Sequence, residues 1–145
     1  MSIKLTLGRL VGAVRSGTTA KVAEQIPPGA YRFRVAKLLD FVNREFEDYS
    51  KQERELVIKY GVKDVEKNTV SMKDATQENA QAFNAELEKL VAVEVSIPYE
   101  PIIFSKLGQA AQDALTIAHV QILGPLLVED EAALTAAPEP TPIKS

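Results

Sequence analysis

The chain has 145 residues, of which 46% are hydrophobic and 26% charged, and its net charge at pH 7 is −3. This length and composition predict one globular domain that is large enough to bury a core. The acidic balance argues against a protein that binds nucleic acid by neutralising many phosphates. Because the chain has no cysteine, disulfides, thiolate metal sites and cysteine nucleophiles are excluded.

The first residues do not have the form of a secretory signal peptide, since Gly8, Arg9, Gly12 and Arg15 interrupt the apolar residues there. No window comes near the roughly 18–20 apolar residues that a membrane-spanning helix requires. We therefore expect a soluble protein that is neither secreted nor inserted in a membrane.

Two patterns overlap near the N-terminus. One has helical spacing, at Leu7, Leu10, Val11 and Val14. The other alternates as a strand does, at Ile3, Leu5 and Leu7. The spacing favours a short helix, although glycines at positions 8 and 12 weaken that prediction and leave a strand open. A second short helix, from Ala20 to Gln25, should end before Pro27.

A long amphipathic helix is predicted near residues 31–60. Its apolar residues form one stripe at helical spacing: Val35, Leu38, Leu39, Val42, Phe46, Tyr49, Leu56 and Tyr60. Charged residues of both signs fill the opposite face, and Gly61 is a candidate left-handed C-terminal cap. At about 1.5 Å per residue the helix is roughly 45 Å long, more than a domain of this size covers by itself. It therefore needs a partner.

A second helix provides one partner within the chain. Asp74 or Thr76 can cap a helix that runs to about Ala92, and it would lie antiparallel to the long helix. Between the two helices, residues 62–66 and 69–72 are typical of a small β-hairpin or an ordered loop. Residues 93–97 and 102–104 are predicted to be extended.

The last predicted element lies within Leu115–Val128, where Thr116 can cap a helix that Gly124-Pro125 kinks or ends. Residues 129–145 are rich in alanine and proline and are predicted to be a flexible tail. The predicted fold class is therefore mainly α. A single domain at residues 1–128 holds a long amphipathic helix in an antiparallel helical hairpin, with shorter flanking helices and a small β-hairpin or extended segments.

Several segments resemble a group of small, uncharacterised helical bacteriophage proteins. They lie between residues 30 and 128: Ala30–Leu39, Leu56–Gly61, Ala82–Leu90, Ser96–Ile102 and Leu123–Leu127. The resemblance implies a phage origin and an accessory or structural protein in the bacterial cytoplasm or the virion. It implies no catalytic residues.

No constellation of residues predicts an enzyme. His119 is the only histidine, and its place in a short apolar helix is more typical of a structural residue than of a catalytic one. The carboxylates of Glu45, Glu47 and Asp48 lie on the charged helix face and are expected to be solvated. Neither nucleotide-binding glycine fingerprint occurs in the chain. We expect no cofactor, no metal and no catalysis.

One cluster could bind an anionic ligand, because cations and aromatic rings concentrate near the N-terminus. It comprises Arg9, Arg15, Lys21, Tyr31, Arg32, Arg34 and Lys37. Arginine suits phosphate geometry, and an aromatic ring can stack on a base. The alternative is that these residues are ordinary solvent-facing or core residues.

Two functions follow as hypotheses. In the first, the protein is a non-enzymatic interaction protein that self-associates through the long helix. The interface would use Val35, Leu38, Val42, Phe46, Tyr49, Leu56 and Tyr60. In the second, the basic cluster binds a small molecule, for example a host nucleotide signal that an anti-defence protein sequesters. Homo-oligomerisation is expected, while contact with membranes or nucleic acid is not.

Overall fold

A computed structural model describes residues 3–130 and 132. In chain order its elements are β1 (Ile3–Thr6), α1 (Leu7–Arg15), α2 (Thr18–Gln25), α3 (Ala30–Tyr60), β2 (Val62–Asp64), β3 (Thr69–Ser71), α4 (Gln77–Val91), β4 (Glu94–Ile97), β5 (Ile102–Ile103), the 3-10 turn η1 (Phe104–Lys106), α5 (Gln109–Ala114), α6 (Ile117–Leu123), the 3-10 turn η2 (Gly124–Leu126) and β6 (Leu127–Val128). The described chain is mainly helical, so the predicted fold class and the long helix are confirmed.

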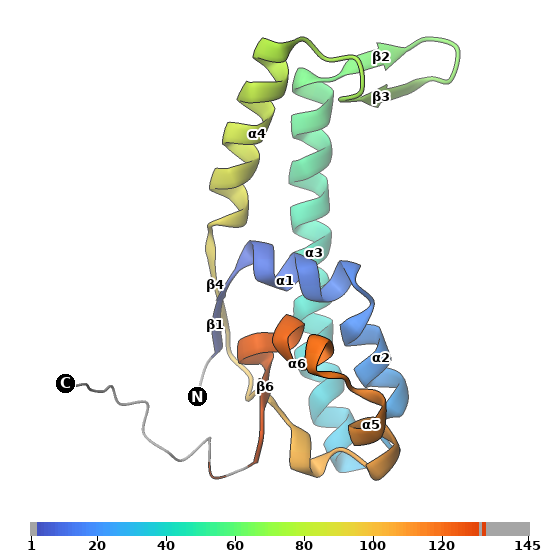
Figure 1. The fold of residues 1–145 in the computed structure, drawn as a ribbon, viewed down its shortest axis with the longest axis vertical. Helices are drawn as coiled ribbons and strands as arrows, with labels where there is room; N and C mark the ends of the chain where they lie inside the picture. Colours follow the sequence, from blue (N-terminus) through green and yellow to red (C-terminus); the bar gives the residue numbers. More distant parts are fainter. Residues whose placement is uncertain (1–2, 131, 133–145) are drawn as a thin grey trace, which may run out of the picture.

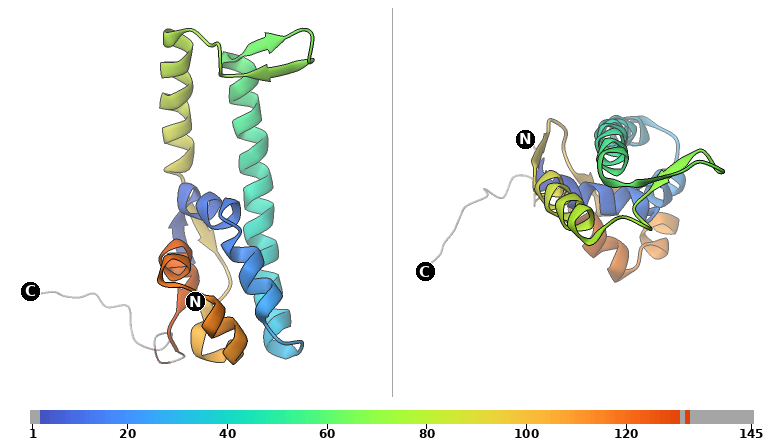
Figure 2. Two further views of the ribbon diagram at one scale, coloured as in Figure 1. Left: turned by 45° about the vertical axis from the view of Figure 1, so that its right-hand side comes forward. Right: turned by 90° about the horizontal axis from the view of Figure 1, so that it is seen from above.

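The molecule consists of a body and an arm that projects from it (Figures 1 and 2). We define the arm as residues 50–60 of α3, the β2–β3 pair and α4. The body holds the remaining elements, including the first two thirds of α3. In the figures α4 lies beside the last part of α3 and runs back towards the body, with β2 and β3 at the far tip.

The N-terminal segment contains a strand followed directly by a helix. In β1 the buried residues alternate with exposed ones, and β1 pairs antiparallel with β4, so that Ile3 lies opposite Ile97 and Leu5 opposite Val95. Thr6 ends the strand and caps α1, because its hydroxyl accepts a hydrogen bond from the Arg9 backbone N–H at 3.3 Å. Both patterns in this segment are therefore real, one after the other.

The core of the body forms where α1, α2, β1 and β4 pack on the first part of α3. Its most completely enclosed side chains are Leu10, Val22, Leu38, Val42, Ile97, Ile102, Leu123 and Leu126. β5 and β6 form a parallel pair at the base of the body, which brings residue 102 opposite residue 127. Residues that are distant in the sequence thus share one core.

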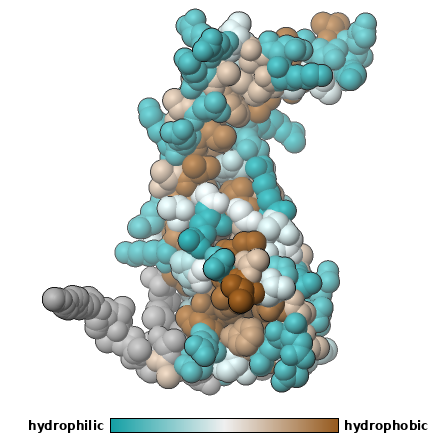
Figure 3. Space-filling model, in the orientation of Figure 1, coloured by the Kyte–Doolittle hydropathy of each residue, from teal (hydrophilic) through white to brown (hydrophobic). Residues whose placement is uncertain are grey.

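The arm differs from the body because its apolar side chains are only partly covered. No residue of α4 is buried, and Tyr49 is the last buried residue of α3. Leu56, Leu87 and Leu90 are half-buried, and Ile58 is 59% exposed. Figure 3 accordingly shows apolar atoms reaching the surface between the hydrophilic side chains of the arm. The chain covers the first part of α3 and leaves the rest partly open.

Gly61 ends α3, but not as the predicted left-handed cap. Its φ and ψ are −82° and 176°, which is extended backbone. Glycine is needed there for space, because a Cβ would lie 2.5 Å from the Val57 carbonyl oxygen and 2.7 Å from the Ser71 carbonyl oxygen. Glycine is thus required at position 61 because β3 packs closely against the end of the helix. It is not required by a left-handed backbone conformation, which was the reason predicted from the sequence.

The remaining predictions concern the ends of elements and the tail. Thr76, not Asp74, caps α4, and Thr116 caps α6, which ends at Gly124. None of the helices in the described residues combines the length and the apolar composition needed to span a bilayer. The predicted flexible tail, residues 129–145, lies largely outside the described residues.

Candidate functional site

The predicted basic cluster does not form one site, since two of its arginines make structural contacts elsewhere. Arg9 donates a hydrogen bond from Nη1 to the Gln121 carbonyl oxygen at 3.1 Å and lies against Gly124. Arg15 forms an ion pair with Glu53. Both guanidinium groups therefore hold α1 against its neighbours and neither residue lines the pocket described below, so their assignment to a ligand site stays a prediction.

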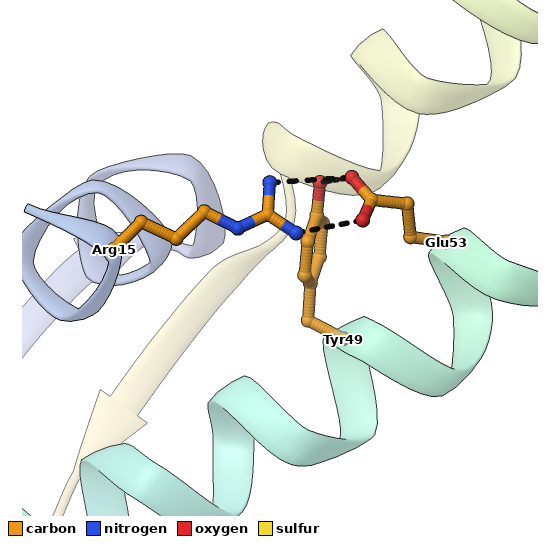
Figure 4. Close-up of polar contacts among 3 residues, drawn as sticks. All are labelled: Arg15, Tyr49 and Glu53. Carbon is orange, nitrogen blue, oxygen red and sulfur yellow. Dashed lines mark hydrogen bonds and ion pairs between the residues drawn. The ribbon is translucent and has the colours of Figure 1, made fainter.

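Arg15, Tyr49 and Glu53 connect the end of α1 to the middle of α3 (Figure 4). Arg15 donates to Glu53 through Nη2 at 2.6 Å and through Nη1 at 3.4 Å, and the Tyr49 hydroxyl donates to the same carboxylate at 2.8 Å. The guanidinium carbon also lies 5.4 Å from the centroid of the Tyr49 ring. The group marks the boundary between the body and the arm.

The same contacts shift three pKa values. The hydrogen bond from Arg15 lowers the pKa of the Glu53 carboxyl, against an opposing effect of burial. The hydrogen bond to Glu53 raises the pKa of the Arg15 guanidinium. Burial, followed by the hydrogen bond to Glu53, raises the pKa of the Tyr49 hydroxyl. The charged pair is thus favoured at neutral pH.

We expect Glu53→Gln to destabilise the fold by about 1 kcal/mol at pH 7, a modest value because Arg15 is half-exposed and solvent screens the pair. Because the folded-state pKa is lowered, the contribution of Glu53 is complete above its ordinary pKa of 4.5 and is lost as the pH falls through the lower folded value. Urea unfolding between pH 3 and 7 measures the difference. Glu47→Gln, at an exposed position of α3, is the matched control, and a pH-independent difference would contradict the ion pair.

The other part of the cluster does come together, in a pocket at the base of the body. The pocket has a volume of about 220 Å³ and lies between the start of α3, the turn after β4 and the β5–η1 segment. From the predicted cluster it includes Tyr31, Arg34 and Lys37, and it adds Phe33, Val35, Tyr99, Glu100, Pro101, Ile103 and Lys106. Lys21 and Arg32 are not among its lining residues.

Tyr31 fixes one wall of this pocket. Its hydroxyl accepts a hydrogen bond from the Ile103 backbone N–H at 2.6 Å, which ties the start of α3 to β5. Lys106 Nζ lies 5.7 Å from the centroid of the Tyr31 ring, and Lys37 Nζ lies 5.0 Å from the centroid of the Phe33 ring. Cations therefore stand beside aromatic rings around an opening whose inner wall includes the buried Ile103.

Sequence reasoning missed Tyr99, Glu100 and Lys106. These residues lie 39 to 46 positions after the end of α3 in the chain, and only the path of the chain after β4 brings them to its first turns. A local signal existed in Pro98 and Pro101, which flank an exposed tyrosine and glutamate as turn residues do. That signal predicts a turn, but it does not predict that the turn lies beside the start of α3.

The predicted interface residues fall into two groups, one on the part of α3 in the body and one in or near the arm. Val35, Leu38, Val42 and Tyr49 are all at most 3% exposed, because the rest of the body packs on them. They present no surface to another molecule, so their assignment to an interface is corrected. Phe46, Leu56 and Tyr60 are half-buried, and the Tyr60 hydroxyl donates to the Glu86 carboxylate across the arm.

His119 has a structural contact. Its Nδ1 accepts a hydrogen bond from the Thr116 backbone N–H at 3.0 Å, while the Thr116 hydroxyl accepts one from the His119 backbone N–H. This reciprocal pair caps α6. Within the described ranges, no group of three or more acidic or histidine side chains is placed to hold a metal ion.

Comparison with known proteins finds no matching family model, no matching curated protein and no matching solved structure. The resemblance to small phage proteins therefore stays a prediction. The functional argument depends on the geometry of the arm and of the pocket.

Proposed function

We propose that this chain is a non-enzymatic interaction protein that self-associates through its arm. The observation that carries the proposal is the lack of any buried residue in α4 and in the part of α3 beyond Tyr49. A pair of helices that buries no side chain completely is a marginal structure by itself, since most helical stability comes from packing an apolar face. A further layer of protein would supply that packing.

A second copy of the same arm is the partner that fits. Two α3–α4 pairs laid side by side would form a four-helix arrangement, in which half-buried apolar residues become enclosed. On α3 these include Leu56, Val57 and Tyr60, and on α4 they are Ala80, Ala82, Phe83, Leu87, Leu90 and Val91. Covering the remaining exposed part of one such leucine, about a third of it or less, contributes roughly 0.5 kcal/mol, so many of these side chains together are needed to offset the cost of association.

The charges of the arm allow such a pairing. Within the arm, α3 carries exposed residues of both signs in close succession: Lys51, Arg54, Glu55 and Lys59. A face with mixed signs can pair with its own copy across a two-fold axis, because each cation has carboxylates within reach on the other subunit. A face of one sign would repel its copy. The predicted helical hairpin is, in this proposal, the assembly unit.

Light scattering coupled to size exclusion tests the proposal on the full chain. We expect a dimer at a concentration of about 100 μM that dissociates on dilution, as weak interfaces of this kind do. Leu87→Lys should yield a monomer that keeps its helical circular dichroism, because it places a charge among the partly buried side chains that a second copy would cover. Ala85→Lys, at an exposed position of the same helix, should leave the dimer intact. A wild-type monomer at every concentration would refute the proposal.

The phage setting belongs to the same proposal. The resemblance of residues 30–128 to small phage proteins supports an accessory or virion-associated role, in which one assembling chain presents its exposed tip and α6 to other components. The tip carries Val65, which is 82% exposed, and α6 carries Ile117, which is 78% exposed. Exposed apolar side chains at the tip of the arm and on the body are typical of a protein that makes more than one contact.

A further inference from the structure

The pocket at the base of the body has the charge of a phosphate site. Three cationic side chains, Arg34, Lys37 and Lys106, surround an opening that includes one carboxylate, Glu100. The formal sum of three positive charges and one negative charge is +2, which complements a phosphate monoester dianion. This excess stands on a chain whose net charge is −3. The pocket is therefore opposite in sign to the molecule as a whole.

The position of the cations near the start of α3 is better explained by a bound anion than by a role in stabilising the helix. The first turn of a helix is the positive end of its dipole, where acidic residues are stabilising and cations are not. The first turn of α3 contains no acidic residue, and the pocket cations Arg34 and Lys37 follow in the next turn. An anion bound there would be stabilised by both the side chains and the helix end. Helix stability alone would favour the reverse choice of residues.

The aromatic residues indicate that the anion also carries a planar ring. Tyr31, Phe33 and Tyr99 lie around the same opening, and Phe33 is 65% exposed although it is a large apolar side chain. Tyr99 has its ring edge to face with Phe41, with a centroid distance of 6.1 Å, which holds it in place at the rim. Aromatic rings that line an opening beside cations provide stacking surfaces for a base.

We infer that this pocket binds a nucleoside monophosphate, with the phosphate at Arg34 and Lys37 and the base between the aromatic side chains. A volume of 220 Å³ lies below the roughly 300–1,000 Å³ of sites that enclose a larger ligand, so one base is expected and not two. Glu100 can only accept hydrogen bonds when ionised. It therefore favours a base that presents an amino group, such as cytosine, over uracil, which presents a carbonyl at the same position.

Isothermal titration of the full chain with CMP, UMP, cytidine and inorganic phosphate tests the inference. We expect CMP to bind, with UMP, cytidine and phosphate each weaker by about tenfold or more, because UMP lacks the amino group, cytidine lacks the phosphate and inorganic phosphate lacks the base. Arg34→Gln should weaken CMP binding by about tenfold or more. Arg32→Gln, an exposed arginine of the same turn outside the pocket, should change it by less than about twofold.

Three results would overturn the inference. The first is the absence of CMP binding at millimolar concentrations. The second is an equal loss in Arg32→Gln and Arg34→Gln, which would indicate diffuse attraction by surface charge. The third is equal affinity for CMP and UMP. This would show that Glu100 does not select a base with an amino group, and would contradict the choice of CMP as ligand. Because the pocket lies in the body, Leu87→Lys should bind CMP normally, so failure of assembly and failure of ligand binding are separate outcomes.

Discussion

Leu38→Ala should lower the free energy of unfolding by about 2–5 kcal/mol, the usual range for a leucine in a packed core. Leu38 is 1% exposed, on the part of α3 that α1, α2 and β4 cover. Removing its side chain leaves a cavity that the surrounding helices fill only in part. Urea unfolding followed by circular dichroism measures the loss.

The same substitution at Leu56 provides a control on the same helix. Leu56 is half-buried in the arm, so Leu56→Ala should cost the isolated chain about 1–2 kcal/mol. If a second copy covers the arm, the cost should rise with protein concentration for Leu56→Ala and stay constant for Leu38→Ala. Equal losses at the two positions would contradict the division of α3 into an enclosed part and an open part.

Gly124→Ala should destabilise the protein by about 3 kcal/mol, through backbone strain and a steric clash together. Gly124 has φ and ψ of +51° and −122°, a conformation that side chains with a Cβ rarely adopt. A Cβ there would lie 2.1 Å from Nη1 of Arg9. The arginine would have to leave, and its hydrogen bond to Gln121 would be lost with it.

Gly12→Ala is the matched control, because it introduces the same methyl group in the opposite setting. Gly12 lies inside α1, its φ is not positive, and a Cβ would meet nothing within 4 Å. We expect this change to stabilise the protein by about 0.5–1 kcal/mol, the difference between alanine and glycine in a helix. Thermal unfolding measures both variants. A neutral Gly124→Ala would show that the bend after α6 adapts to a side chain.

Local patterns in the sequence were sufficient for much of the secondary structure. The stripe from Val35 to Tyr60 predicts α3, because helical spacing over so many turns is difficult to satisfy otherwise. Thr76 and Thr116 predict helix starts because the cap is a contact between residues three apart. The segment at residues 3–14 left a choice between strand and helix, which Thr6 resolves by ending one and beginning the other.

The candidate site was only partly predictable, for a reason that depends on distance along the chain. Tyr31, Arg34 and Lys37 are three residues apart on one helix, so their common face follows from helical geometry. Arg9 and Arg15 are close to them in sequence, but contacts with Gln121 and Glu53, at separations of 112 and 38 residues, direct them elsewhere. Without a fold, proximity in the sequence does not distinguish a ligand residue from a structural one.

The chain enters the arm along α3 and returns to the body along α4, which leads into β4. The β2–β3 pair lies at the far end, between these two helices in the sequence. Each added or removed helical residue moves that end by about 1.5 Å without altering the body, provided both helices change together. The reach of the tip is thus a dimension that evolution or design can adjust by whole turns. In this sense the arm is a spacer of tunable length, built into a domain whose pocket it does not touch.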